Sequence, residues 1–146
     1  MPDARPTLVV GVALVDDLGR PTRLLGARRT APAELAGGWE LPGGKVDPGE
    51  EPLDALHREA REELGVGIDV GVHLVGPHAD GTWPLGADYR MHVWLAVVND
   101  GVPQPLEDHD ELRWLTPGDL YAVPWLPADL AIVRAVGGRQ IGRAHV

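Results

Sequence analysis

The sequence contains no cysteine and no phenylalanine, and its only lysine, Lys45, stands against 12 arginines. Without cysteine the chain forms neither disulfides nor thiolate metal sites, and this composition fits a reducing compartment. No apolar run approaches the roughly 18 residues that a membrane-spanning helix needs. No signal-peptide or transit-peptide pattern opens the chain. We therefore expect a soluble, cytoplasmic protein without a membrane partner.

Positive charge is scarce. The sequence has 13 basic and 22 acidic side chains, which gives a formal net charge of −9. A nucleic-acid polymer requires a basic stripe to meet its phosphates, so we expect no such partner. Many of the acids fall within 40–63, where the chain carries Glu40, Asp47, Glu50, Glu51, Asp54, Glu59, Glu62 and Glu63. Bound divalent cations would reverse the local field and let a polyphosphate approach this surface.

The segment 43–66 reads as a glycine-rich turn, a short acidic loop and a helix. Pro52 suits the first helical turn, where its missing N–H has no partner to lose. Gly65 is typical of the left-handed residue that follows a last turn. At 3.6 residues per turn the helix shows one apolar stripe that can pack against a sheet. The stripe consists of Leu53, Leu56, Ala60 and Leu64.

Three carboxylates share the adjoining helix face, because positions three and four apart are neighbours. They belong to Glu59, Glu62 and Glu63. One interpretation is a solvated acidic surface, although Arg58 and Arg61 are the only basic residues of the helix. The other is a set of hard oxygen ligands for Mg²⁺ or Mn²⁺. The helix alone leaves both open.

The spacing of the whole segment adds a resemblance. Gly44, five residues, Glu50, seven residues and then REAREELGV (58–66) match the Nudix box at its defining positions, and the preceding WELPGG (39–44) resembles MutT-type members. The sequence is thus identified as a member of the Nudix hydrolases. The resemblance implies an α/β fold, a Nudix α/β/α sandwich with a mixed β-sheet, with the box helix on one side and the last helix on the other. At 146 residues the chain forms a single domain, 1–146.

The activity that the resemblance implies is Mg²⁺-dependent hydrolysis of a nucleoside triphosphate to monophosphate and pyrophosphate, with Mn²⁺ as a possible substitute. Two or more ions would be held by Glu59, Glu62, Glu63 and the carbonyl of Gly43. One of the three glutamates would act as general base, and family members differ on which. Arg58 would belong to the catalytic set as a clamp on Glu59 or Glu50.

A further metal ligand is implied in the acidic loop before a later strand. In MutT-type enzymes this acid lies six residues before the strand tryptophan, and counting back from Trp114 gives Asp108. Glu107 and Glu111 remain alternatives.

Substrate contacts are implied at three positions. Arg29, fourteen residues before Gly43, takes the place of an arginine that contacts phosphate. Asp129 takes the base-pocket position of a P-A-[ND] segment, although an acid there also compensates the helix dipole. Trp83 belongs to a predicted loop, 76–86, beside the site. The favoured substrates are 8-oxo-dGTP or (d)CTP, and the alternatives are ADP-ribose or a dinucleoside polyphosphate, or a non-catalytic nucleotide sensor. The choice between monomer and homodimer stays open.

Elsewhere the pattern predicts a hairpin early in the chain and a helix near its end. The predicted strands are Thr7–Val15, Thr22–Arg28, Ile68–Val75, Tyr89–Val98 and Arg113–Leu115, with one helical turn at Pro117–Leu120 and a final helix at Ala128–Val136. We expect flexible ends at 1–6 and 137–146.

Overall fold

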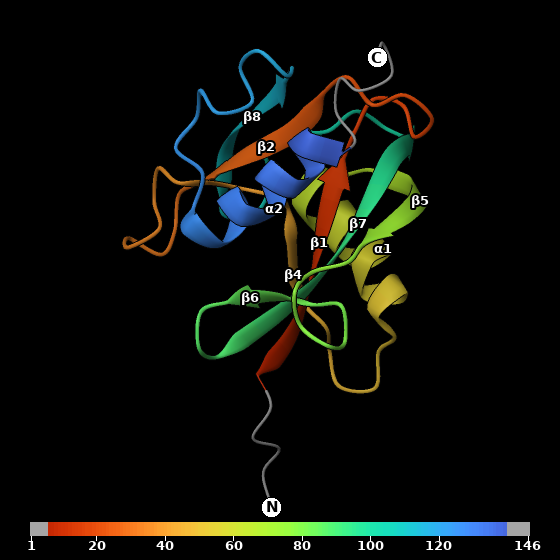
Figure 1. Cartoon of the computed structure of the whole chain (residues 1–146), viewed down its shortest axis with the longest axis vertical. Coiled ribbons are helices and arrows are strands. Elements are labelled where there is room, and N and C mark those ends of the chain that lie inside the picture. Colours follow the sequence, from red (N-terminus) through yellow and green to blue (C-terminus); the bar gives the residue numbers. More distant parts are fainter. Residues whose placement is uncertain (1–5, 140–146) are drawn as a thin grey trace, which may run out of the picture.

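The structure is a computed structural model that describes residues 6–139. Within this range ten elements follow one another (Figure 1). They are β1 (Thr7–Leu14), β2 (Leu24–Arg29), β3 (Trp39–Glu40), β4 (Gly43–Lys45), α1 (Pro52–Leu64), β5 (Gly67–Leu74), β6 (Trp83–Leu85), β7 (Tyr89–Asp100), β8 (His109–Leu115) and α2 (Pro127–Arg139).

The larger sheet is mixed and is built around β7. β1 pairs with β7 in parallel from Thr7–Tyr89 to Leu14–Ala96. β5 and β6 both pair with β7 in antiparallel fashion, and β4 pairs with β1 in the same way. The predicted hairpin between the first two strands is therefore wrong, because both edges of β1 are taken by β4 and β7. A single bridge, Val15–Leu24, joins the two segments.

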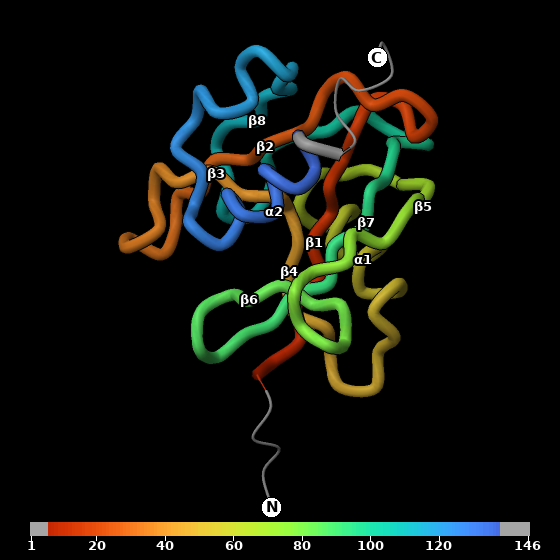
Figure 2. Tube along the Cα trace, in the orientation of Figure 1, coloured from red at the N-terminus to blue at the C-terminus, as the bar shows by residue number. Residues whose placement is uncertain are grey.

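β2 instead belongs to a smaller antiparallel sheet with the order β3-β2-β8. Figure 2 shows these three strands together on one side of the molecule. β8 begins at His109, four residues earlier than predicted, so that Asp110 and Glu111 lie on a strand rather than in a loop. This sheet carries the end of β2, with Arg28 and Arg29, toward the start of β8.

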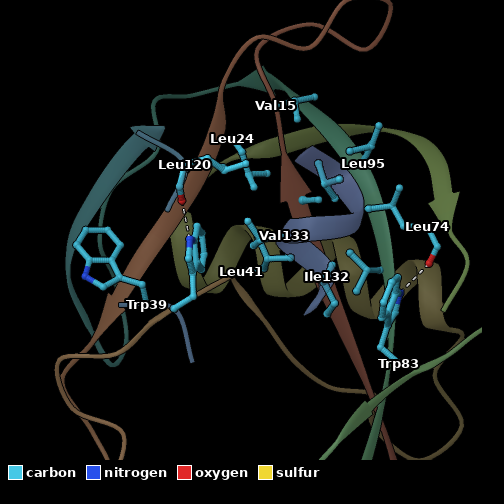
Figure 3. Packing of buried hydrophobic residues seen from close by; sticks show 14 of the residues in the cluster. Val15, Leu24, Trp39, Leu41, Leu74, Trp83, Leu95, Leu120, Ile132 and Val133 are labelled. Atoms are coloured by element: carbon cyan, nitrogen blue, oxygen red, sulfur yellow. Dashed lines mark hydrogen bonds between the residues drawn. The ribbon is translucent and has the colours of Figure 1, made fainter. Parts of the chain in front are cut away.

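Side chains of β1 alternate between two cores, as the period of a strand requires. Val10, Val12 and Leu14 pack in the cluster that includes Leu56 of α1. Val9, Ala13 and Val15 pack in the other cluster, with Ile132, Val133 and Val136 of α2. The second cluster is drawn in Figure 3, and in Figure 1 the two helices lie on opposite sides of β1. The predicted sandwich is confirmed.

α1 starts and ends as predicted, with Pro52 in its first turn and Gly65 left-handed at φ 72°. Its buried face differs by one position, because Ala55 is fully buried whereas Leu53 is 46% exposed. The neighbouring sheet selects that face. Buried residues also include Glu59 and Glu63, which brings two acids to the edge of the core.

The C-terminal region departs from the predictions at two places. Residues 117–120 form hydrogen-bonded turns and no helix. α2 runs from Pro127 to Arg139, so that 137–139 are helical rather than part of a flexible tail. Of the predicted flexible ends, residues 1–5 and 140–146 lie outside the described part of the chain. None of the helices in that part is long and apolar enough to cross a membrane.

Candidate active site

Arg58 joins α1 to the loop that precedes it. Its Nε and Nη2 donate to the two carboxylate oxygens of Glu50, each at 2.9 Å, in a two-pronged bond. Nη1 donates to Glu59 at 2.9 Å and to Glu62 at 3.3 Å, and Nη2 also donates to the carbonyl of Lys45 at 2.9 Å. Hydrogen bonds from Arg58 lower the pKa of Glu50 to about 2. The predicted clamp is present and reaches both Glu50 and Glu59.

The predicted glycine-rich turn is a strand in the structure, because Gly43 and Gly44 lie on β4 and pair with β1. Glu59 of α1 lies against Gly44. A Cβ built on Gly44 would come within 2.3 Å of Oε1 of Glu59, so this close approach requires glycine. Burial raises the pKa of Glu59, and the hydrogen bond from Arg58 opposes the rise. Glu59 is thus a carboxylate in a place where its negative charge is costly, which a bound cation would relieve.

His109 lies between two acids that come from distant segments. Its Nε2 is 2.8 Å from Oε2 of Glu40, and its Nδ1 is 3.3 Å from Oε2 of Glu63. Nδ1 also lies 3.2 Å from the carbonyl oxygen of Leu106. Burial alone would lower the pKa of His109, but the hydrogen bonds with the two glutamates outweigh it and raise the pKa to about 9.

The segment before β8 is fastened to the C-terminal end of α1 by backbone bonds. Leu106 N–H donates to the carbonyl of Glu63 at 3.1 Å, and Gln104 N–H donates to that of Leu64 at 3.0 Å. These bonds bring His109 to the helix. The sequence analysis missed both His109 and Glu40. The available signals were the position of Glu40 in WELPGG and a histidine directly after the predicted loop ligand.

The loop acids do not join this group. The Asp108 side chain is 63% exposed and lies 3.9 Å from Nη2 of Arg29. Glu111 lies 3.5 Å from Arg28 on the neighbouring strand, and Glu107 occupies a turn with φ 54°. Within residues 6–139, one group of three His or acidic side chains has ligand atoms all within 4.8 Å of one another, namely Glu40, Glu63 and His109. The structure thus gives no support to Asp108 as a ligand.

Glu59, Glu62 and Glu63 share the predicted face of α1 but do not form such a tight group. Glu59 and Glu63 are buried, whereas the Glu62 side chain is 46% exposed. Gly43 lies on β4 against β1, so closely that a Cβ there would meet the carbonyl oxygen of Val10 at 2.0 Å. The roles of these residues as ligands and base stay predictions.

A pocket of about 570 Å³ opens beside β4. Gly43 and Gly44 form part of its wall, and its apolar lining includes Leu35, Leu41, Met91 and Leu126. Its charged lining includes Arg29, Glu40, Lys45 and Asp129. The pocket therefore combines apolar and charged lining residues next to Gly44, which contacts Glu59.

Two predicted substrate residues line this pocket. Arg29 donates through Nη1 to Oε2 of Glu40 at 2.8 Å and through Nε to the carbonyl of Ala31 at 2.7 Å. Asp129 is buried in the first turn of α2, and its Oδ1 accepts from the N–H of Leu41 at 3.0 Å. Burial raises the pKa of Asp129 to about 7, although the Leu41 bond opposes this.

Trp83, the third predicted substrate residue, is placed differently. It begins β6 rather than a loop, and its ring is 8% exposed within the core on the α2 side. Its indole N–H donates to the carbonyl of Leu74 at 2.9 Å, as Figure 3 shows. The side chain packs in the core and is not among the residues that line the pocket, so the structure gives no support to Trp83 as a substrate contact.

Comparison with known proteins gives consistent matches over this fold. The NUDIX domain family matches residues 5–136. A Mycobacterium tuberculosis protein named "Putative 8-oxo-dGTP diphosphatase 2" is 44% identical over 122 residues, which cover 84% of this chain and 82% of the relative. The CTP pyrophosphohydrolase of Escherichia coli is 35% identical over 116 residues, covering 80% and 83%.

Solved structures agree. The crystal structure of a MutT NUDIX hydrolase from Burkholderia pseudomallei superposes with a TM-score of 0.69 at 31% identity, covering 90% of this chain and 98% of that one. The family match over residues 5–136 includes β4, the acidic helix and the residues that line the pocket. This chain therefore belongs to the Nudix hydrolases.

Proposed function

We propose that this enzyme hydrolyses nucleoside triphosphates to the monophosphate and pyrophosphate with Mg²⁺ or Mn²⁺, and that it acts on 8-oxo-dGTP or on a cytidine triphosphate. One observation carries the proposal. Gly43 and Gly44 of β4 line the pocket that also contains Asp129, and Glu59 of α1 lies against Gly44. A nucleotide whose base enters the pocket has its phosphates beside the acidic face of α1.

The donor set suits a hard divalent cation. Carboxylate and carbonyl oxygens are the ligands that Mg²⁺ prefers, and Glu59, Glu62, Glu63 and the Gly43 carbonyl would hold it. Glu59 fits because burial raises its pKa and only Arg58 among the described residues donates a hydrogen bond to it. When bound, the cation neutralises phosphate oxygens and makes its coordinated water easier to deprotonate.

The protein groups then mainly align the reaction. Water adds to phosphorus, the anhydride bond between the α- and β-phosphates breaks, and the proton from water passes to one of the glutamates of α1. Phosphoryl transfer depends mostly on positioning and on charge neutralisation. Arg58 supplies positioning, because its Nη1 donates to Glu59 and holds that carboxylate against Gly44.

The pocket residues would select the base. Asp129 is buried and lines the pocket, so its carboxyl group can meet the polar edge of a base. Arg29 shares Glu40 with His109, and an incoming phosphate would compete with Glu40 for its guanidinium group. The two relatives named for 8-oxo-dGTP and CTP support these substrate classes.

A substrate panel tests the proposal. Wild-type protein and Mg²⁺ are incubated with the four dNTPs, CTP, 5-methyl-dCTP, 8-oxo-dGTP, ADP-ribose and a dinucleoside tetraphosphate, and pyrophosphate and orthophosphate release are scored separately. We expect pyrophosphate from 8-oxo-dGTP or a cytidine triphosphate well above the rest. Preference for ADP-ribose or the tetraphosphate would refute the substrate assignment. Absence of turnover on all of them would make the domain a nucleotide sensor.

Glu62→Gln tests the acidic face in the same assay. We expect kcat to fall by about two orders of magnitude, because the variant removes a charged donor or the base from the reaction. The melting temperature should change little, since the side chain is half exposed. Glu51→Gln makes the same charge change at an exposed position of the helix start and serves as the control. A folded Glu62→Gln variant with normal kcat would remove Glu62 from the site.

A further inference from the structure

One buried side chain, that of His109, links the acidic face of α1 to the pocket. His109 comes from the start of β8, Glu63 from α1 and Glu40 from β3. Glu63 lies on the acidic face of the helix, whereas Glu40 lines the nucleotide pocket and receives Arg29. The imidazole of His109 contacts both carboxylates, so any rotation of the ring would move both of them.

The two contacts use different ring nitrogens. Nε2 faces Glu40, and Nδ1 faces Glu63 and the Leu106 carbonyl. Ionised carboxylates and carbonyls only accept, so each nitrogen must donate. A cation bound between the same three side chains would have to take one nitrogen as its ligand and break one contact. We therefore interpret the group as a triad held by a hydrogen bond between His109 and Glu40 and an ion pair between His109 and Glu63, instead of a metal centre.

The surroundings fix the ring further. The His109 side chain is fully buried, and no buried side-chain nitrogen or oxygen in the described part of the chain lacks a partner. Oε2 of Glu40 accepts from both His109 and Arg29, each at 2.8 Å. This oxygen is thereby held on the pocket wall by two donors, and loss of either one frees the carboxylate to reorient.

We propose that His109 is a positioning residue that holds Glu63 on the metal-binding face of α1 through Nδ1 and Glu40 on the pocket wall through Nε2. It thus sets metal binding through an ion pair with Glu63 and nucleotide binding through a hydrogen bond to Glu40. The proposal rests on the proposed function, which makes Glu63 a metal ligand. It adds a residue outside the box and assigns it two separable effects.

Two conservative variants separate those effects. The amide nitrogen of asparagine replaces Nδ1 of histidine in position, and that of glutamine replaces Nε2. His109→Asn therefore keeps a donor toward Glu63 and loses the one toward Glu40. His109→Gln keeps a donor toward Glu40 and loses the one toward Glu63. If the buried ring had a purely structural role, each variant would lose metal binding and nucleotide binding together.

Mn²⁺ binding without nucleotide and steady-state kinetics at saturating Mg²⁺ provide the readouts. For His109→Gln we expect Mn²⁺ affinity to fall by about tenfold, as for other residues that orient metal ligands, while KM changes by less than about threefold. For His109→Asn we expect KM to rise by about tenfold and Mn²⁺ affinity to stay within about threefold. His78→Gln, at an exposed turn, is the matched control. Equal changes in both variants, or none in either, would overturn the proposal.

Ring N–H protons of the wild-type protein give a test that does not depend on folded variants. In ¹⁵N-histidine-labelled protein, the buried ring of His109 should show two slowly exchanging N–H signals. Mg²⁺ without nucleotide should move the Nδ1–H signal, and a non-hydrolysable nucleotide analogue without metal should move the Nε2–H signal. A single N–H signal, or both signals moving with either ligand, contradicts the triad.

The two proposals fail differently. If the wild-type protein turns over no nucleotide, the proposed function is lost. Mn²⁺ affinity of the glutamine and asparagine variants and the N–H signals still decide whether His109 positions the two glutamates. If the wild-type protein hydrolyses nucleotides but both variants lose Mn²⁺ affinity and nucleotide binding in parallel, the proposed function stands and the proposed role of His109 is wrong.

Discussion

At the scale of single residues, the Arg58 side chain donates hydrogen bonds to four partners. The guanidinium group reaches Glu50, Glu59, Glu62 and the Lys45 carbonyl. A lysine in its place would offer a point charge without the planar fork that matches a carboxylate. The geometry of the acidic face therefore depends on an arginine that need not touch the substrate.

Replacing Arg58 should reduce activity through the ligands it holds. We expect Arg58→Ala to lower kcat/KM and Mn²⁺ affinity by about 10- to 100-fold, as removal of a ligand-orienting partner does elsewhere. Arg58→Lys should also be impaired. On a logarithmic scale, it should recover less than half of the kcat/KM and Mn²⁺ affinity that Arg58→Ala loses. Arg61→Ala, one turn along the same helix, removes an exposed pair with Asp100 and should remain near wild type. Full activity in Arg58→Lys would show that charge alone suffices.

Asp129 gives a prediction about pH and stability. Its pKa is raised by burial to about 7 from an ordinary value of 3.8, so the folded protein keeps a proton that the unfolded chain releases between pH 4 and 7. The free energy of unfolding therefore falls as pH rises through this window, by up to about 1.4 kcal/mol per pH unit, and the contribution is constant above it.

Asp129→Asn should remove that slope. The amide oxygen can still accept from Leu41, so the variant should be about as stable as wild type near pH 4 and more stable than wild type near pH 7.5. Urea unfolding at several pH values measures the difference between the two proteins, in which other titrating groups cancel. A constant difference across this range would show that Asp129 titrates normally.

At the scale of elements, strand β4 before α1 begins with two adjacent glycines that have different neighbours. A Cβ on Gly43 would meet backbone atoms of β1 at 2.0 to 3.0 Å, whereas one on Gly44 would meet the end of the Glu59 side chain. Backbone atoms within a sheet cannot yield, but a side-chain carboxylate can rotate away. The first glycine thus serves packing of β4 on β1, and the second leaves room for the active-site carboxylate.

Alanine at each position should separate stability from activity. Gly43→Ala should lower the melting temperature by several degrees, because β4 must move off β1. Gly44→Ala should lower it less and still reduce kcat by at least about tenfold, because Glu59 is displaced. Thermal unfolding and steady-state kinetics of both variants provide the comparison. Equal melting temperatures with equal kcat values would contradict the assignment.

At the scale of the whole molecule, the sequence predicted what is encoded locally. The segment 43–66 carries its own start and stop signals, so α1 was predicted within one residue. Pairing over long distances was not accessible: the run after the first turn suggested a hairpin, but β7 provides the partner for β1. Leu53 shows the same limit, since the sheet that covers α1 decides which face is buried.

Prediction of the site divides along the same line. The acids of α1 and their arginine follow from spacing, whereas His109 and Glu40 meet only through folding. Counting back from Trp114 led to Asp108, one residue from the histidine that enters the core. Trp83 resembled a loop residue because Pro84 and Gly86 follow it closely. Pairing with β7 nevertheless places it on strand β6.

Divalent metal should stabilise the folded protein, which concentrates carboxylates around α1. We expect Mg²⁺ or Mn²⁺ at about 100 times its dissociation constant to add about 2.7 kcal/mol to the free energy of unfolding, and EDTA to reverse this. Glu62→Gln should show a smaller rise. NaCl of equal ionic strength is the control, because a protein of net charge −9 also gains from screening alone. An equal effect of NaCl would mean that no specific ion is bound.

The parallel pairing of β1 with β7 has a consequence for the order in which the molecule can assemble. Thr7 pairs with Tyr89, so the central strands meet only after most of the chain has left the ribosome. Until then β1 can pair on one edge with β4, and α1 has only part of the sheet to cover. Pairings between distant residues are slow because loop closure must precede any gain from contacts. During synthesis the apolar first strand therefore keeps one edge unpaired until β7 has been made.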